Sequence, residues 1–345
     1  MFIHTHLDRY HVIDTIYMEW ILLDVSVTIT VAVYNGSKHL EGCIASIASQ
    51  TYRDFEVLFV VDSKTDDDSV EIIERLSVDL PSSRIVIQED KDRLSGARNI
   101  GIKEAKGDII WFLDVDDHPY PTFLEDLIRI MDENDADMVF CNHFQECDPI
   151  VPEIEDRDYG IEVYDGHSAV GRFSELPVYS WSRIQRASIF ESGDAFFYNH
   201  GAAEDIEQTI RSLAVSDRVV YYGKPLYVYY KLGGSATQAH RGAEAESIEN
   251  TARRMSEFVR ERCPDQYDGF RRRMLERLMR QMAFVGYKEY KRVYSGSIAH
   301  EFLREIDDRT MEMRVFSMSK TLYYLILLPF TRKIWDGKTG PWGRF

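Results

Sequence analysis

The chain has 345 residues, of which 44% are hydrophobic and 12% aromatic, so it can bury a real core and is not a disordered chain. The length fits one large domain with an appendage, or two domains. Its formal net charge of −17 argues against a general nucleic-acid-binding protein, because such proteins carry a basic surface, and we expect no nucleic-acid partner.

Residues 1–24 mix His, Asp and aromatic side chains without clear periodicity. They are either an N-terminal extension or the product of an upstream mis-start with Met18 as the true initiator, and both interpretations stay open. They lack the basic start and apolar middle of a signal peptide, and no stretch reaches the roughly 18–20 apolar residues of a spanning helix. Cys43 and Cys141 lie in apolar segments without zinc-binding spacing, which predicts buried thiols and a reducing, cytoplasmic location.

From Val25 to about Cys141 the chain alternates between strand-like and helix-like segments. The apolar, β-branched runs predict strands at Val25–Val33, Phe55–Val61, Arg84–Ile87, Ile109–Leu113 and Met138–Cys141. Helical spacing between them predicts helices over residues 37–50, 66–76, 95–107 and 121–133. Strands that alternate with helices predict βαβ units, and therefore an α/β fold with a mainly parallel sheet flanked by helices.

The strand Ile109–Leu113 is followed at once by three carboxylates, Asp114, Asp116 and Asp117. Right-handed crossovers bring the carboxyl ends of parallel strands to one edge of the sheet, so Asp62, after the second strand, is expected beside them. Magnesium and manganese bind such oxygen ligands together with substrate phosphates. We interpret this edge as a metal–diphosphate site. The alternative is a solvated turn whose aspartates cap the next helix.

Beyond Asn142 the pattern is less regular. Trp181–Phe190 predicts a strand and turn, residues 201–214 a helix that starts with Glu204-Asp205, and Val219–Tyr230 an aromatic strand. From about Glu244 helical segments dominate, with a basic stretch over residues 271–292 that has apolar residues at helical spacing. The short apolar block Leu322–Phe330 is followed by Arg332 and Lys333, so it either lies at a membrane surface or packs on the core.

Six short motifs, in this order and spacing, resemble the family 2 glycosyltransferases, which have the GT-A fold. The motifs are Val33-Tyr34-Asn35, Ser49-Gln50-Thr51-Tyr52, Val60–Asp66, Leu94-Ser95-Gly96-Ala97-Arg98-Asn99, Phe112–Asp117 and Glu204-Asp205. The resemblance covers residues 25–240 and implies a catalytic domain there, followed by a mostly helical region, 241–345, that contacts the membrane surface under one of the two interpretations above. Ala32 and Arg93 depart from the family pattern, and the turn Asp62-Ser63-Lys64-Thr65 lacks one carboxylate and a glycine, which weakens the base-recognition assignment.

The resemblance implies transfer of a sugar from a nucleoside-diphosphate sugar, with a UDP-sugar as our first expectation, to a hydroxyl group, with inversion at the anomeric carbon. It implies a divalent metal cofactor, Mn²⁺ or Mg²⁺. The expected acceptor is a glycan or a polyprenol-linked sugar in the synthesis of cell-surface polysaccharide or glycoconjugate. If the C-terminal region binds the membrane, the enzyme would act at its cytoplasmic face.

The resemblance also assigns roles to single residues. Asp205 matches the catalytic base, with Glu204 as the substitute; the alternative role of this pair is to stabilise a helix N-terminus. Asp116 and Asp117 are expected to hold the metal, and Asp114 is a further ligand or a contact to the donor sugar.

Further assignments concern the two substrates. Tyr34, Asn35 and Asp62 are expected at the nucleobase and ribose, and Arg98 at the nucleotide or diphosphate; turn chemistry and a helix-surface ion pair are the alternatives. Trp181 and His240 are candidates for the acceptor side, with a core aromatic and a solvated histidine as the alternatives.

Three other classes of protein are weaker interpretations. A sugar nucleotidyltransferase has a glycine-rich loop with an arginine after the first strand, whereas Tyr34–Lys38 contains one glycine. A non-catalytic sugar-nucleotide or glycan-binding module would be expected to lose the acidic ligands or the base, all of which are present here. A dinucleotide-dependent dehydrogenase is disfavoured because no GxGxxG motif follows a strand.

Overall fold

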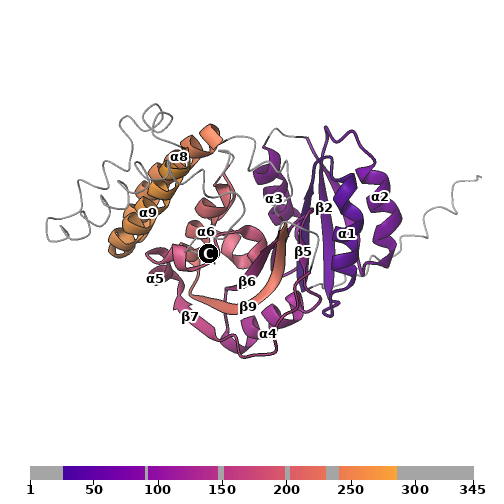
Figure 1. The fold of residues 1–345 in the computed structure, drawn as a ribbon, viewed down its shortest axis with the longest axis horizontal. Coiled ribbons are helices and arrows are strands. Elements are labelled where there is room, and N and C mark those ends of the chain that lie inside the picture. Colours follow the sequence, from indigo (N-terminus) through magenta and orange to yellow (C-terminus); the bar gives the residue numbers. More distant parts are fainter. Residues whose placement is uncertain (1–25, 90–91, 147–150, 199–202, 231–240, 286–345) are drawn as a thin grey trace, which may run out of the picture.

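The computed structural model describes residues 26–89, 92–146, 151–198, 203–230 and 241–285. In this part of the chain, one sheet runs through the middle of the molecule, with helices on both faces (Figure 1). Its strands are β1 (Val27–Val33), β2 (Phe55–Asp62), β3 (Ser83–Gln88), β4 (Ile109–Asp114), β5 (His118–Pro119), β6 (Met138–Glu146), β7 (Ile161–Asp165), β8 (Arg183–Arg186) and β9 (Arg218–Tyr230).

The strand order is β3-β2-β1-β4-β8-β6-β9-β5, and β7 also pairs with β9. The strands β3, β2, β1 and β4 are parallel, as are β6 and β9. The strands β8, β5 and β7 add to this sheet in the antiparallel direction. The predicted α/β fold with a mainly parallel sheet is therefore confirmed. Of the antiparallel additions, β7 and β8 belong to the region whose pattern is irregular, whereas β5 follows directly after the acidic cluster.

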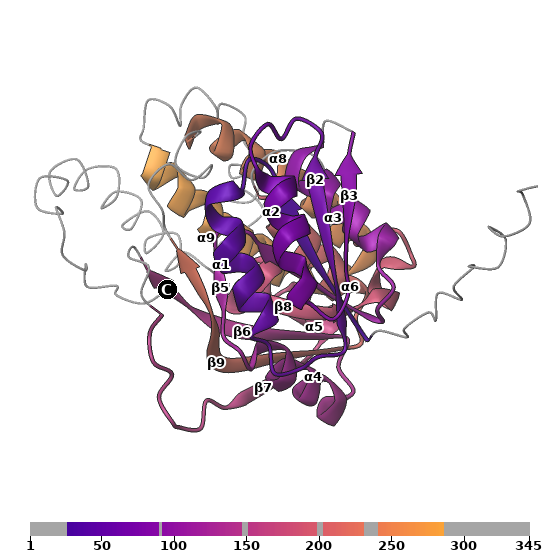
Figure 2. The same ribbon diagram turned by 90° about the vertical axis from the view of Figure 1, so that its right-hand side faces the viewer.

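The two faces of the sheet are covered by different helices because side chains alternate along each strand. Ile109, Trp111 and Leu113 pack with α1 (Ser37–Ala48), α2 (Ser69–Leu76) and α4 (Phe123–Asn134). Ile110 and Phe112 point to the other face, which is covered by α5 (Gly166–Val170), α6 (Glu204–Val215) and the C-terminal helices. Figure 2 shows α1 and α2 in front of the sheet and α8 and α9 behind it.

Helix α3 (Arg93–Glu104) packs unusually close to strand β1. A Cβ atom added at Gly101 would lie 2.3 Å from Cγ2 of Thr30, so only glycine fits at this contact. Arg98 is one helical turn before Gly101 and is only 2% exposed. The close approach of α3 therefore carries the Arg98 guanidinium into the interior, close to the end of β4.

The C-terminal helices α8 (Arg241–Arg262) and α9 (Tyr267–Val285) pack against each other at one end of the molecule (Figure 1). Met274 and Leu278 in the basic stretch are fully buried in the core, so the apolar face of α9 packs on the protein. No helix in the described ranges is long and apolar enough to cross a membrane. The block Leu322–Phe330 and residues 1–24 lie outside the described residues.

Short 3₁₀ helices complete the described part of the chain. They cover Ser77–Asp79, Phe173–Glu175, Ser180–Ser182, Ala187–Phe190 and Pro264–Gln266. The segment Ser180–Ser182 lies where the sequence pattern predicts the start of a strand, and β8 begins only at Arg183. The predicted buried thiols are confirmed, because Cys43 and Cys141 are free and buried.

Candidate active site

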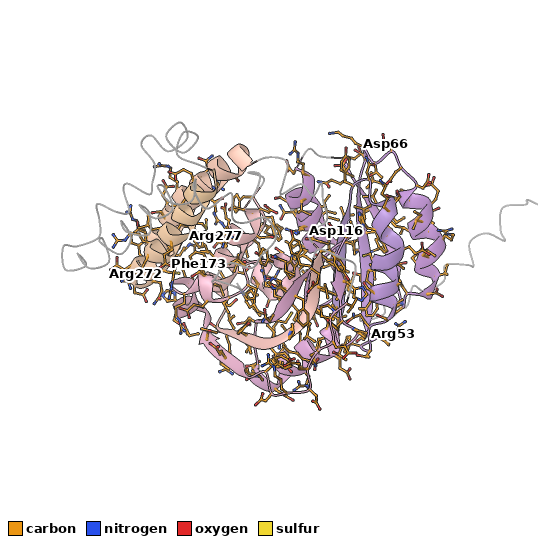
Figure 3. The ribbon with its side chains drawn as sticks, in the orientation of Figure 1. Arg53, Asp66, Asp116, Phe173, Arg272 and Arg277 are labelled. Atoms are coloured by element: carbon orange, nitrogen blue, oxygen red, sulfur yellow. The ribbon has the colours of Figure 1, made fainter. Side chains whose placement is uncertain are left out.

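The carboxyl ends of β1, β2 and β4 meet at one edge of the sheet, as expected. Ala32 pairs with Asp114 of β4, and Val33 pairs with Val61 of β2, so Asp62 and the acidic cluster follow neighbouring strands. In Figure 3, Arg53, which precedes β2, lies at the lower end of the sheet, whereas Asp66 lies at the upper edge. The side chain of Asp116 lies near the middle of the molecule.

The turns after β1 and β2 are tied to each other by side-chain hydrogen bonds. Asn35 has a left-handed backbone, with φ 48°, and its Oδ1 accepts a hydrogen bond of 3.0 Å from the backbone N–H of Asp66. Oδ1 of Asp62 accepts a 2.8 Å bond from the N–H of Lys64, which closes the second turn. The Tyr34 ring is 62% exposed beside these turns, so it is available to a planar ligand.

Asp117 is buried and held by strand β9. Its Oδ2 accepts a 3.0 Å hydrogen bond from the Tyr227 hydroxyl, and its Oδ1 accepts a 3.2 Å bond from the Tyr230 N–H. Burial, and then the charges of Asp114 and Asp116, raise the pKa of Asp117 well above its usual value. A cation at this edge would relieve that repulsion.

Asp114 is paired with the buried arginine of α3. Nη2 of Arg98 donates to Oδ1 of Asp114 at 3.0 Å, and its Nη1 donates to Oδ1 of Asp205 at 2.6 Å. Oε1 of Glu204 lies 3.5 Å from the same Nη1. One guanidinium thus joins the end of β4 to the start of α6, and it brings together four residues that the sequence singles out.

One cation cannot neutralise three carboxylates, and the titration of the cluster reflects this. Burial by itself lowers the pKa of Arg98, but Asp205, Asp114 and Glu204 raise it above its usual value. Burial raises the pKa of Asp114 to about 6 against the opposing effect of Arg98. Burial and then the Asp205 charge raise the pKa of Glu204 to about 7, against the opposing effect of Arg98, whose contact with Glu204 is the longest of the three.

Glu204→Gln is expected to change the pH dependence of stability. A carboxyl whose folded-state pKa is raised stabilises the protein fully at low pH, and this contribution is lost as pH rises from about 4.5 through about 7. The variant lacks this loss, so its stability relative to the wild type should rise between pH 5 and pH 8, by on the order of 1–3 kcal/mol. Denaturant unfolding of both proteins at pH 5 and pH 8 measures this difference in the free energy of unfolding. Glu257→Gln, at an exposed site on α8, is the control, and an equal response of both variants would contradict the prediction.

Glu204 and Asp205 do stabilise a helix N-terminus, which is the alternative role given above, and they also contact Arg98. They occupy the first turn of α6, where the helix dipole favours negative charge. The residue before them, Ala203, has no capping side chain and has a left-handed backbone with φ 83°. Such a conformation costs an alanine on the order of 1 kcal/mol, so the surrounding contacts hold the start of α6 in place.

Trp181 is buried in a stack of aromatic rings. Its ring lies nearly parallel to those of Tyr179 and Tyr227, with centroid distances of 4.9 and 4.3 Å. The indole is 3% exposed and Tyr179 is 39% exposed, so Tyr179 presents this stack to solvent. This arrangement matches the core-aromatic alternative for Trp181, and His240 lies outside the described residues.

The three carboxylates after β4 do not form a cage for a metal. Within the described ranges, no group of three or more His, Cys, Asp or Glu residues is arranged to hold an ion. Asp114 is paired with Arg98 and Asp117 with β9, whereas no hydrogen bond or ion pair joins the Asp116 carboxylate to another of the described residues. This chemistry fits magnesium or manganese, which commonly use one or two protein carboxylates and complete their shell with substrate phosphates and water.

Comparison with known proteins shows which family this chain resembles. Residues 28–190 match the family model for glycosyl transferase family 2. The chain is 29% identical over 227 residues to the glycosyltransferase GlyA of Streptococcus pneumoniae, covering 63% of this chain and 32% of GlyA. It is 32% identical over 127 residues to the Escherichia coli enzyme WfaP, a UDP-Glc:α-D-GlcNAc-diphosphoundecaprenol β-1,3-glucosyltransferase, covering 36% of this chain and 49% of WfaP. The chain thus spans about a third of the length of GlyA and half that of WfaP.

Solved structures show the same architecture. S. aureus TarS residues 1–349, in complex with UDP-GlcNAc, superposes with a TM-score of 0.59 at 17% identity, covering 87% of this chain and 82% of TarS. The mannosyltransferase PcManGT of Pyrobaculum calidifontis, in complex with GDP-Man and Mn²⁺, gives 0.51 at 16% identity, with coverages of 90% and 88%. The fold is that of the GT-A glycosyltransferases. Residues 28–190 are therefore a glycosyltransferase family 2 region, and the curated relatives that the chain matches are glycosyltransferases.

Proposed function

We propose that this enzyme transfers a sugar from a UDP-sugar to a hydroxyl of a glycan or polyprenol-linked acceptor, with a divalent metal and with inversion at the anomeric carbon. The observation that carries this proposal is the Asp205 carboxylate, held by Arg98 against Asp114 at the edge of the sheet. In one-step inversion the acceptor hydroxyl attacks the anomeric carbon while a base removes its proton. Asp205 is that base, and Glu204 is its substitute.

The donor lies along the ends of β1, β2 and β4 in this proposal. Tyr34, Asn35 and Asp62 contact the nucleobase and ribose, and Asp114 lies toward the donor sugar. The complex of TarS with UDP-GlcNAc supports a uridine nucleotide. We now assign Arg98 to the carboxylates that it contacts, because its donors Nη1 and Nη2 both point to them.

Asp116 is the residue that would hold the metal together with the donor diphosphate, and the Mn²⁺ complex of PcManGT supports this use of a divalent ion. When bound, the metal would neutralise the charge that develops on the nucleoside-diphosphate leaving group. A cation at this edge would favour the charged forms of Asp117 and Asp114, which burial disfavours in its absence.

The acceptor approaches from the side of Asp205 in this proposal. The activity in the name of WfaP, glucosyl transfer to a diphosphoundecaprenol-linked sugar, supports a polyprenol-linked acceptor in surface-glycan synthesis. Tyr179 is the exposed ring on that side, and Trp181 supports it from below the surface. A cytoplasmic location is part of the proposal, and the free buried thiols of Cys43 and Cys141 fit it.

A donor panel tests the proposal. UDP-glucose, UDP-N-acetylglucosamine and GDP-mannose are incubated with the enzyme and Mn²⁺, Mg²⁺ or EDTA, and nucleotide release and UDP affinity are measured. We expect consumption of one donor only with metal. We also expect a loss of metal-dependent UDP affinity of about tenfold or more in Asp116→Ala, since Asp116 would hold the metal that neutralises the diphosphate.

Asp132→Ala is the matched control, because Asp132 is exposed on α4. Turnover that is unaffected by EDTA, with unchanged UDP affinity in Asp116→Ala, would remove the metal from the proposal. Metal-dependent binding of UDP without turnover of any donor would instead favour a non-catalytic sugar-nucleotide-binding module.

A further inference from the structure

The protein binds Oδ1 of the Asp205 carboxylate through two hydrogen bonds. Oδ1 accepts a 2.6 Å hydrogen bond from Nη1 of Arg98 and a 2.5 Å hydrogen bond from the hydroxyl of Ser180. Within the described ranges, no hydrogen bond reaches Oδ2. A carboxylate held in this way has one defined orientation, with Oδ2 as the oxygen available to an acceptor hydroxyl.

Ser180 belongs to a segment that is fastened to α6 at several points. The side chain of Ser180 is fully buried, and the residue starts the 3₁₀ turn Ser180–Ser182. Oγ of Ser182 donates to the carbonyl of Tyr179 at 2.7 Å, which closes this turn. Oγ1 of Thr209, one turn after Asp205 on α6, donates to the carbonyl of Asp205 at 2.7 Å and also lies 3.3 Å from the carbonyl of Val178. The Ser180 hydroxyl therefore reaches Asp205 from a backbone with little freedom to move.

The buried side chain of Arg183 bridges the same two segments. Its Nη1 donates to the carbonyl of Tyr179 at 3.0 Å, and its Nη2 donates to Oε1 of Gln208 on α6. Tyr179 precedes Ser180, and Gln208 lies one helical turn after Asp205. A single planar guanidinium thus links the chain on both sides of the Ser180–Asp205 hydrogen bond.

Arg183 is an unusual residue for a purely structural position. It is 1% exposed, and no carboxylate of the described residues lies within ion-pair distance of it. Burial lowers its pKa to about 9, while the Asp205 charge opposes this shift. An unpaired buried cation costs folding free energy, so packing by itself does not account for an arginine here.

We propose that Ser180 and Arg183 are positioning residues for the transfer reaction: Ser180 fixes Oδ1 of Asp205 so that Oδ2 faces the acceptor, and Arg183 locks the Ser180 segment to α6. This inference rests on the proposed role of Asp205 as the base. Both residues act on the reaction through Asp205, so their removal should lower kcat and leave donor affinity unchanged.

Ser180→Ala is expected to lower kcat by about tenfold to a hundredfold, because displacement of a catalytic base by about 1 Å lowers the rate by a factor of that size. Arg183→Met should give a similar loss, and Arg183→Lys should recover only part of it, since an ammonium keeps the charge but cannot bridge both segments. The measurements are kcat and KM for the donor selected from the panel above, UDP affinity and the thermal unfolding midpoint.

The controls are matched by residue type, and Ser216 is also matched by burial. Ser216→Ala removes a buried hydroxyl that bonds only the carbonyl of Ser212 at the far end of α6. Arg186→Met removes a guanidinium from the same strand, β8, where Nε donates to the carbonyl of Ala136. Both controls should keep kcat within about twofold, whereas an equal loss in the controls would overturn the inference.

A double variant separates this inference from the proposed function. If Ser180 acts only through Asp205, Ser180→Ala should have no further effect on the residual rate of Asp205→Asn. Multiplying losses would mean that Ser180 acts elsewhere, and would overturn the inference. Full activity of Asp205→Asn would instead overturn the proposed base. A normal kcat in Ser180→Ala beside an inactive Asp205→Asn would overturn the inference while the base assignment stands.

Discussion

Asp205→Asn is expected to lower kcat by about 10²–10⁴-fold, because the amide keeps the shape of the side chain but cannot accept the proton of the acceptor hydroxyl. The affinity for UDP should stay within about twofold, since Asp205 lies on α6 and the proposed nucleotide contacts lie at the ends of β1 and β2. Steady-state kinetics with the donor chosen from the panel, together with calorimetric titration of UDP, measure the two quantities.

Two comparisons make this result specific to the base. Asp132→Asn, at an exposed site on α4, should retain the wild-type kcat. Glu204→Gln should retain most of the activity, because Glu204 makes the longest contact with Arg98 and no contact with Ser180. If Glu204→Gln loses activity and Asp205→Asn keeps it, the two residues exchange roles. If both keep it, the base lies elsewhere in the chain.

Arg98→Met is expected to have the largest effect on stability. Removal of the guanidinium leaves Asp114, Asp205 and Glu204 together without a cation, and breaking a buried ion pair by removing one partner costs about 3–5 kcal/mol. The loss should depend on pH. Without Arg98 the folded-state pKa of Asp114 and that of Glu204 are raised further, so stability present at low pH is lost as pH rises. Denaturant unfolding should therefore show a larger loss at pH 8 than at pH 5.

The control for this experiment is an arginine that pairs at the surface. Arg129 on α4 contacts Glu133 at 3.0 Å and is 48% exposed, and such pairs contribute about 0–1 kcal/mol. Arg129→Met should therefore change stability little, at either pH. A loss below about 1 kcal/mol for Arg98→Met at pH 8, or a loss that does not depend on pH, would contradict the view of Arg98 as the cation of a buried acidic cluster.

The sequence by itself determined the sheet edge at which the site lies. The apolar runs that end in Asp62 and Asp114 are local patterns. The alternation of strands with helices brings the carboxyl ends of parallel strands to one edge, whatever the length and sequence of the loops. The registers of β1 with β2 and β4 follow this expectation. The resemblance that names Glu204 and Asp205 also depends only on short motifs and their order in the chain.

Only the tertiary structure decided which charges meet. Arg98 and Asp205 are 107 positions apart, and Asp117 and Tyr227 are 110 apart, so their contacts depend on how α3, α6 and β9 pack on the sheet. Periodicity indicates which side of a helix is buried, but it carries no information about the partner on another element. Ser180 and Arg183 had no local signal for the same reason: a serine before a strand and an arginine within it become positioning residues only because α6 packs over them.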